Sequence, residues 1–126
     1  MSLRTPLGQV LGRGSAKDGT AHFFGQRISG IGLLLLGLWF VGSIATMPGF
    51  AYADAIAFIS TPINGVLLVL LVATLAYHSS LGIQVVIEDY VHSHGLELAC
   101  LVVSRFAHGF LAVAAIYAIF RIGLSA

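Results

Sequence analysis

The spacing of charged side chains constrains this chain most, because it leaves three long apolar stretches uninterrupted. The stretches that contain no Lys, Arg, Asp or Glu are residues 28–53, 55–87 and 106–120. About 20 consecutive apolar residues are enough for a helix to cross the hydrocarbon of a bilayer. Allowing for Pro, Gly and polar clusters, the sequence predicts three membrane-spanning helices, at about residues 28–47, 63–87 and 98–120.

The composition excludes a water-soluble globule. Of 126 residues, 58% are hydrophobic and only 9% are charged, whereas a soluble domain has about 25% charged residues. The single cysteine, Cys100, excludes an internal disulfide and any CxxC motif. A net charge of +1 gives no indication of a nucleic-acid partner. We therefore expect an all-α integral membrane protein, with residues 1–126 forming one membrane-anchor domain surrounded by lipid.

The basic residues predict an orientation. Arg4, Arg13, Lys17 and Arg27 precede the first span, and residues 48–61 contain no Lys or Arg. By the positive-inside rule, the N-terminal segment, residues 1–27, then lies on the cytoplasmic (or matrix) side. Three spans place the C-terminus on the opposite side. We expect a multi-pass protein of a bacterial inner membrane, with the mitochondrial inner membrane as the less favoured alternative.

Pro, Gly and polar residues predict where the spans end. Met47-Pro48-Gly49 ends the first span. The segment Phe50–Ser60 is short and apolar, and it fits either a short interfacial helix or a loop lying on the membrane. Thr61-Pro62 is typical of an N-cap and first helical residue, which would open the second span. The residues from Glu88 to Glu97 are predicted to form a polar connector.

His78 lies inside the second uncharged stretch and is the strongest functional candidate. An ionisable side chain in lipid is costly and is usually retained for a function. Neutral imidazole is a common ligand of haem iron, and Gly82, one turn later, would let a flat macrocycle lie against the backbone. The alternative is a histidine bonded to a serine or carbonyl of a neighbouring helix. The residues alone leave both interpretations open.

Asp89 and Tyr90 close the same stretch. Eleven residues of helix separate His78 from Asp89, which is about 20° past three full turns and about 16 Å along the axis. The two side chains should therefore face the same way, with Asp89 nearer the membrane surface. A phenol can donate a hydrogen bond to a quinone carbonyl, and a nearby carboxylate can orient it or relay protons. The alternative is that Tyr90 only anchors the helix at the interface. The combination suits electron transfer between a haem and a quinone.

The other polar residues have less specific interpretations. His108 lies at a depth similar to that of His78, so it could supply a second iron ligand; three helices, however, can hardly enclose a haem, which favours a second membrane subunit. Arg105 could snorkel, pair with an acidic residue or meet a haem propionate. His22 and Arg27 form a basic, aromatic collar, or a simple interfacial anchor. His92 and His94 are most simply exposed residues of the connector.

These residues resemble a known family. The pattern His78-x3-Gly82-x6-Asp89-Tyr90 is similar to the signature of the hydrophobic membrane anchor subunit of succinate dehydrogenase (respiratory complex II, the D subunit). The order of the spans and the segment from His22 to Gly30, which includes Gln26-Arg27, agree with it. The resemblance covers nearly the whole chain in layout, and its specific part is about thirteen residues.

The resemblance implies a non-catalytic subunit of a quinone-reducing complex, with a flavoprotein, an iron–sulfur subunit and a second anchor subunit of the cytochrome b type as partners. It implies that His78 is one axial ligand of haem b and that the second ligand comes from the other anchor subunit. Tyr90 would bind ubiquinone, with Asp89 beside it. Arg27 approximately matches the family's basic residue ahead of the first helix. The sequence contains no flavin or nucleotide motif and no Cys cluster, so no stand-alone activity is expected.

Two other functions compete with this one. The chain could anchor a fumarate reductase or form a dihaem cytochrome b that works with menaquinol, although two haems would need more histidines inside the spans. It could also be a haem-free structural subunit of a transporter. Buried polar residues on several helices would then be expected, and the first span has almost none.

Overall fold

The computed structural model describes residues 19–125. These residues form four helices, α2 (Gly19–Ala45), α3 (Tyr52–Ser60), α4 (Pro62–Tyr90) and α5 (His94–Ser125). By length and composition, three of them could cross a membrane: Thr20–Ala45, Pro62–Tyr90 and His94–Ser125. The expected all-α architecture with three apolar spans is confirmed to that extent. Arg4, Arg13 and Lys17, on which the predicted orientation partly depends, lie outside the described residues.

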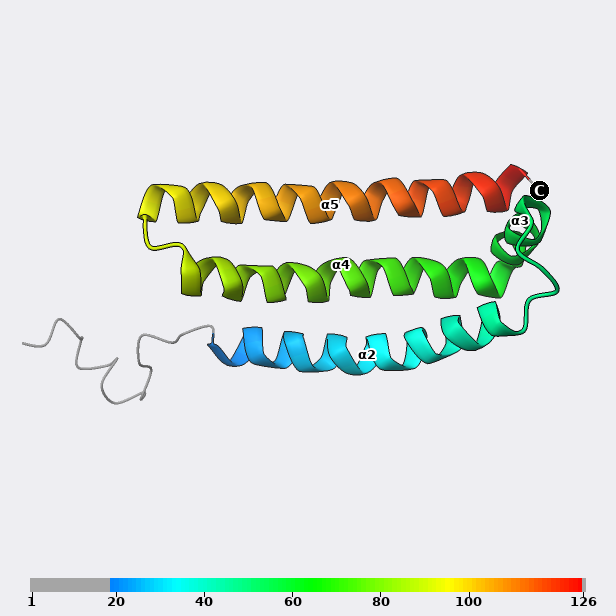
Figure 1. Cartoon of the computed structure of the whole chain (residues 1–126), viewed down its shortest axis with the longest axis horizontal. Helices are drawn as coiled ribbons and strands as arrows, with labels where there is room; N and C mark the ends of the chain where they lie inside the picture. The colour runs from blue at the N-terminus through cyan, green and yellow to red at the C-terminus, as the bar shows by residue number, and fades with distance from the viewer. Residues whose placement is uncertain (1–18, 126) are drawn as a thin grey trace, which may run out of the picture.

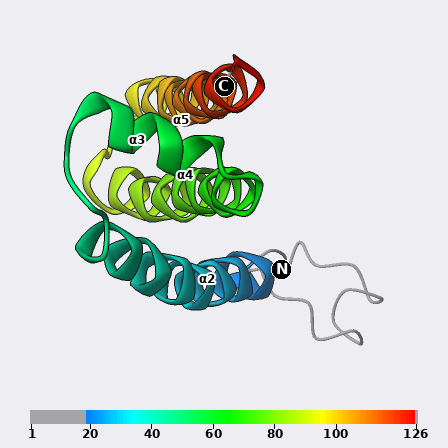
Figure 2. The ribbon, with the colours of Figure 1, turned by 90° about the vertical axis from the view of Figure 1, so that its right-hand side faces the viewer.

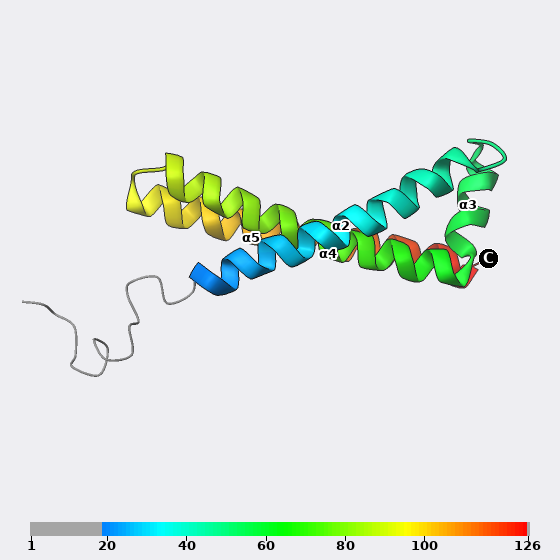
Figure 3. The same ribbon diagram turned by 90° about the horizontal axis from the view of Figure 1, so that it is seen from below.

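The three long helices lie side by side, with α4 in the middle (Figures 1 and 2). α4 contacts both α2 and α5, whereas α2 and α5 share no contact within residues 19–125. Seen from below, α2 crosses α4 and diverges from it toward α3 (Figure 3). The start of α2, the end of α4 and the start of α5 share one end of the bundle, which we call the turn end; α3 lies at the other, the α3 end.

The apolar side chains of the described helices point outward. None is fully buried within residues 19–125, and exposed fractions reach 65% at Leu38 and 77% at Phe106. Apolar surface of this kind is stable against lipid or a partner subunit, not against water. Helices in lipid associate through small residues and polar contacts instead of a hydrophobic core. Accordingly, the one buried polar residue of the described chain is Ser29, which is 6% exposed.

The helices are longer than the predicted spans. α2 begins at Gly19 and ends at Ala45, and the connector expected over residues 88–97 contracts to residues 91–93. The reason is that hydropathy marks only the part of a helix that suits hydrocarbon, while the backbone hydrogen bonds continue beyond it. The 29 residues of α4 extend for about 44 Å, more than the roughly 30 Å of a hydrocarbon core, so its ends reach the interfacial layers.

The segment between the first two spans contains a short helix, α3, which confirms one of the two alternatives for it. Its start is held by Asp54, whose Oδ2 accepts the backbone N–H of Ala51 at 3.0 Å. Thr61 is the N-cap of α4 and Pro62 follows in the first turn, as predicted. The Thr61 hydroxyl does not cap the helix, because it donates to the carbonyl of Ala57 at 3.1 Å.

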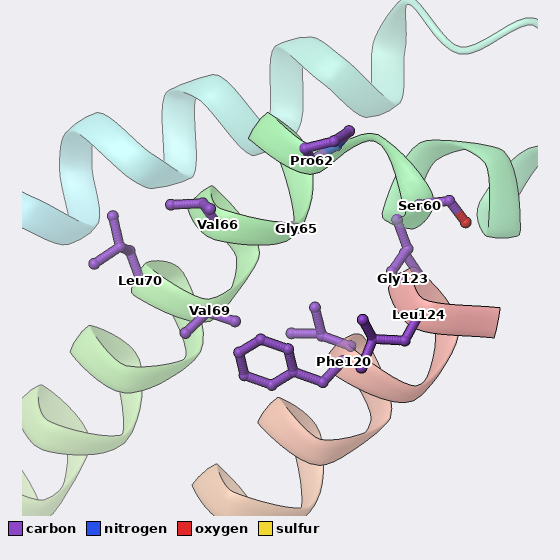
Figure 4. Close-up of a pocket in the computed structure, with 11 residues that line it drawn as sticks. Ser60, Pro62, Gly65, Val66, Val69, Leu70, Phe120, Gly123 and Leu124 are labelled. Atoms are coloured by element: carbon purple, nitrogen blue, oxygen red, sulfur yellow. The ribbon is translucent and has the colours of Figure 1, made fainter. Parts of the chain in front are cut away.

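An apolar pocket of about 390 Å³ lies at the α3 end, between the start of α4 and the last turns of α5 (Figure 4). Val69, Leu70, Phe120 and Leu124 contribute to its wall, and Ser60 is the only polar side chain in the lining. No titratable group faces this space. The lining of this pocket therefore contains no side chain that could bind a metal or transfer a proton, and the candidate site lies elsewhere along α4.

Candidate functional site

His78 projects from α4 toward α2. Its Nδ1 lies 2.9 Å from Ser29 Oγ, and its Nε2 lies 3.4 Å from the side-chain nitrogen of Gln26. Gly30 lies beside the ring, since a Cβ there would be in van der Waals contact with its Cε1 atom at 3.5 Å. His78 is thus half-buried in the α2–α4 interface, between a hydroxyl and an amide of the neighbouring helix.

The direction of these hydrogen bonds follows from the single proton of the Ser29 hydroxyl. The nearest acceptors of that proton are the carbonyls of Gly25 at 2.6 Å and Gln26 at 3.2 Å. With the proton donated to Gly25, Ser29 Oγ accepts from His78, and we assign Nδ1 as the protonated ring nitrogen. Nε2 then carries the lone pair. Its contact with the Gln26 amide, at 3.4 Å, is longer than the 2.7–3.2 Å typical of a good N–H hydrogen bond. The hydrogen bond to a serine of a neighbouring helix, which was the alternative interpretation of His78, is therefore present. It engages Nδ1 and leaves Nε2 with only the long contact to Gln26.

Two further polar atoms of the same face lack partners. His22 Nε2 and Gln26 Oε1 are buried without a hydrogen bond, although buried polar atoms are normally paired. His22, Gln26 and Ser29 are four and three residues apart, so they share one face of α2. Gly82 adjoins this face, since a Cβ there would lie 3.7 Å from the Gln26 side-chain nitrogen. We call these four residues and His78 the α2–α4 polar site.

His108 belongs to the other interface of α4. Its Nδ1 donates to the carbonyl of Ser104, one turn earlier on α5, at 2.7 Å. Its Nε2 accepts from the hydroxyl of Ser79 at 3.0 Å. Both ring nitrogens are therefore occupied within the chain. Because Ser79 and His78 are adjacent and face different helices, His78 and His108 do not form a pair of ligands for one iron.

Asp89 and Tyr90 lie in the last turn of α4, at the turn end. Both are exposed, and Tyr90 is 78% accessible. No other part of the described chain covers the phenol, so it is available to a ligand or to a partner subunit. Its binding of quinone stays a prediction, as does the supporting role of Asp89.

The basic residues do not join the α2–α4 polar site. Arg27 is exposed, and its guanidinium lies 4.9 Å from the centre of the Phe23 ring on its own helix. Arg105 reaches the carbonyl oxygen of the Gln84 side chain at 3.4 Å, and the Gln84 amide donates to Glu88 at 2.8 Å. The link between Arg105 and an acidic residue is therefore indirect, through Gln84.

The remaining histidines lie in the α4–α5 connector and at the first residue of α5. His92 and His94 are exposed, as expected, although His94 belongs to the helix instead of the connector. Its ring lies 4.0 Å from Glu97. The described residues contain no cluster of three or more His, Cys, Asp or Glu that could hold a metal ion.

Sequence reasoning missed the specific contacts of Gln26 and Ser29 with His78. Both residues were noticed only as part of the segment at the head of the first helix. The available signal was the spacing of His22, Gln26 and Ser29, which places three polar residues on one face of an apolar helix. Such a face needs a polar partner on a neighbouring helix, and His78 is the only histidine in the next span.

Comparison with known proteins gives consistent results. A sequence profile of the family described as the succinate dehydrogenase/fumarate reductase transmembrane subunit matches residues 1–120. The succinate dehydrogenase hydrophobic membrane anchor subunit of Rickettsia bellii (strain RML369-C) is 33% identical over 120 residues, which are 95% of this chain and 96% of that protein. The subunit of the same name from Paracoccus denitrificans is 29% identical over 122 residues, which are 97% and 94% of the two chains.

Proposed function

The chain belongs to the family of succinate dehydrogenase/fumarate reductase transmembrane subunits, and on that basis we propose that it anchors a succinate:quinone oxidoreductase in the membrane and helps to bind haem b and quinone. His78 supplies one axial ligand of the haem iron. Tyr90 and Asp89 contribute to the quinone site. The observation that carries the proposal is the position of His78 in the α2–α4 interface, where Nδ1 lies 2.9 Å from Ser29 Oγ and Nε2 makes only a 3.4 Å contact.

The residues of the α2–α4 polar site fit a haem. Neutral imidazole binds iron through one nitrogen while the other donates a hydrogen bond that fixes its orientation, and His78 donates from Nδ1 to Ser29. The orphaned His22 Nε2, as the protonated nitrogen of its ring, could donate a hydrogen bond to a propionate at the edge of a porphyrin. Gly82 leaves the α4 backbone open beside them. When bound, haem b supplies one-electron redox chemistry; the chain supplies position and hydrogen bonds.

A second anchor subunit completes the site in this proposal. Within the described residues α4 is contacted by α2, α5 and the short helix α3, and the apolar outer surfaces of the three long helices are exposed. A haem needs walls on both faces and a second axial ligand. His108 does not supply that ligand, because Ser79 and Ser104 occupy its ring nitrogens. The partner of cytochrome b type therefore contributes the opposite wall and the second histidine.

The quinone site lies at the turn end of the bundle. Tyr90 is exposed there, and its phenol can donate a hydrogen bond to a quinone carbonyl. Reduction of a quinone to a quinol takes up two electrons and two protons, and the exposed carboxylate of Asp89 would relay protons to this site. Arg27, on α2, has a weaker supporting role, since its guanidinium stacks on Phe23.

The turn end faces the cytoplasm in this proposal. The start of α2 and the α4–α5 connector share that end (Figure 1), so the positive-inside orientation of residues 1–27 places Tyr90 on the cytoplasmic side of a bacterial inner membrane. The iron–sulfur and flavoprotein subunits dock there and deliver electrons to ubiquinone. Residues 1–126 act as a single anchoring domain.

The test uses the complex purified in mild detergent. The chain should co-purify with a second membrane subunit, an iron–sulfur subunit and a flavoprotein. In the His78→Ala complex the bis-histidine haem b spectrum should be lost or altered, while succinate oxidation with an artificial electron acceptor continues, because that reaction needs no haem. A reduced-minus-oxidised spectrum identical to that of the wild type would overturn the ligand assignment.

An anchor with two haems is disfavoured by the hydrogen bonding of His108. Two haems require four ligands, and the predicted spans 28–47, 63–87 and 98–120 contain only two histidines, His78 and His108, of which His108 has both ring nitrogens hydrogen-bonded. A fumarate reductase anchor with a single haem remains the second candidate, because the family description names both enzymes. The co-purifying flavoprotein, assayed in both directions, distinguishes them.

A further inference from the structure

We propose that Ser29 is a positioning residue for His78: its hydroxyl holds the imidazole in the one tautomer that presents Nε2 to iron. This inference rests on the proposed role of His78 as a haem ligand. Ser29 is the most enclosed residue of the described chain, at 6% exposure. It lies on α2, 49 residues before His78, and it would not touch the iron.

A directed chain of hydrogen bonds carries the proposal. His78 Nδ1–H donates to Ser29 Oγ at 2.9 Å, and Ser29 Oγ–H donates to the carbonyl of Gly25 at 2.6 Å. The carbonyl of Gly25 can only accept, so the direction of the whole chain is set at that end. Because Ser29 is buried, water does not compete for either bond.

Gln26 could stabilise the opposite tautomer of His78, and the hydrogen bond to Ser29 disfavours that tautomer. The side-chain oxygen of Gln26 is buried without a partner, and the nitrogen of the same amide lies 3.4 Å from His78 Nε2. A rotation of the amide by half a turn would bring the oxygen to that position. The opposite tautomer of His78 could then donate from Nε2 to Gln26, and the nitrogen needed by iron would be protonated. The Ser29 hydroxyl opposes this, because with Nδ1 unprotonated it would have to donate to Nδ1 and give up its 2.6 Å bond to the carbonyl of Gly25.

The same chain of bonds sets the electron density on Nε2. Donation from Nδ1–H makes an imidazole a stronger ligand, and such outer hydrogen bonds usually change metal affinity by about 10–100-fold. A stronger donor favours ferric over ferrous iron. Loss of the Ser29 hydroxyl should therefore weaken haem binding and raise the midpoint potential of the haem.

The chain contains a matched control. Ser79 also bonds a histidine across a helix interface, with 3.0 Å between its hydroxyl and His108 Nε2. It faces α5, whereas Ser29 faces α4. Ser79→Ala removes a hydroxyl of the same kind without removing any contact of His78.

The experiment measures the purified complex, not its turnover. Haem midpoint potentials are obtained by spectroelectrochemical titration, and haem retention by transfer to apomyoglobin. Ser29→Ala should raise the potential and lower haem affinity by about 10–100-fold. Ser29→Thr keeps the hydroxyl and should restore both values. Ser79→Ala should match the wild type. If the Ser29→Ala complex is not recovered, Ser29→Cys, which has a weaker acceptor, should shift the potential in the same direction.

The outcomes separate this proposal from the one on which it rests. A wild-type spectrum in the His78→Ala complex would remove the haem ligand, and with it any role for Ser29. A lost spectrum in His78→Ala, together with a wild-type potential and haem retention in Ser29→Ala or Ser29→Cys, would overturn the positioning role alone. Equal shifts in Ser29→Ala and Ser79→Ala would also overturn it, because the effect would then not depend on contact with His78.

Discussion

Each of the two faces of α4 pairs a histidine with a serine across a helix interface, but the hydrogen bonding of the histidine differs. Toward α2, His78 is bonded to a serine of the neighbouring helix; toward α5, the adjacent Ser79 is bonded to His108. Both contacts pair a serine with a histidine inside a membrane-spanning bundle, and their lengths are similar. They differ in direction, because Ser29 accepts from its histidine and Ser79 donates. The α2 face thus leaves a ring nitrogen available, and the α5 face uses both.

The partner of Nδ1 explains the difference. His108 donates from Nδ1 to a carbonyl of its own helix, one turn away, and its Nε2 then completes its bonding with Ser79. His78 donates to a serine whose proton is already committed to Gly25, and its Nε2 meets only a long contact with Gln26. A histidine in a membrane helix is therefore a candidate ligand when one nitrogen is held and the other is not, whatever its depth.

Replacement of His108 is the strongest way to break the comparison. His108→Leu should keep the bis-histidine haem spectrum. It should lower the free energy of unfolding of the complex by about 1–3 kcal/mol, because Ser79 and the Ser104 carbonyl lose their hydrogen-bond partner. Melting in detergent and a reduced-minus-oxidised spectrum measure the two effects. If the ligand signal disappeared in His108→Leu, the assignment of the two faces would be reversed.

Two tyrosines of α4 extend the comparison to quinone reduction: Tyr90 lies at the exposed end of the helix, and Tyr77 lies on the face toward α2. Tyr90→Phe should slow quinone reduction by about tenfold, the equivalent of one lost hydrogen bond of roughly 1.4 kcal/mol, while succinate oxidation with an artificial acceptor stays unchanged. Tyr77 lies against α2, where a Cβ on Gly25 would meet its hydroxyl at 2.6 Å. Tyr77→Phe should leave quinone reduction near the wild-type rate. Equal losses in both variants would argue against a specific role for Tyr90.

Substitutions at two glycines of α2 test how closely this helix must approach α4. Their expected effect on stability is the smallest of those considered. Gly37 has open space around it, so Gly37→Ala should be neutral or stabilise by about 0.5–1 kcal/mol, as Ala does in helices. At Gly25 the added methyl would meet Tyr77 and also lie 3.3 Å from Leu81. Gly25→Ala should therefore lose that gain and lower the melting temperature relative to Gly37→Ala. The same melting temperature in both would show that the interface is loose at Gly25.

Much of the fold was predictable because apolar length is a property of the chain itself. The three uncharged stretches indicated the three long helices, and Thr61-Pro62 marked the start of α4. The extents were less predictable, since α2 runs back to Gly19 and α5 begins at His94, where polar residues continue the helix outside the apolar part. α3 was one of two alternatives, because a segment of that length suits both a loop and a helix.

The candidate site was predictable only in part. His78 was identifiable from its position in an uncharged stretch, and the resemblance to anchor subunits indicated haem. The choice between a ligand and a histidine bonded to a serine was not available from the residues, and in the structure the serine contact at Nδ1 coexists with only a 3.4 Å contact at Nε2.

The sequence alone determined that three helices are apolar enough to span a membrane, and that one of them carries a histidine and an Asp-Tyr pair on the same side. Those properties depend on neighbours along the chain and on the helical repeat. Tertiary structure decided which nitrogen of each histidine is engaged, because the partners of His78 lie on another helix, 49 and 52 residues away. A hydrogen bond is directional and acts over about 3 Å, so the role of an imidazole is settled only when the helices are packed.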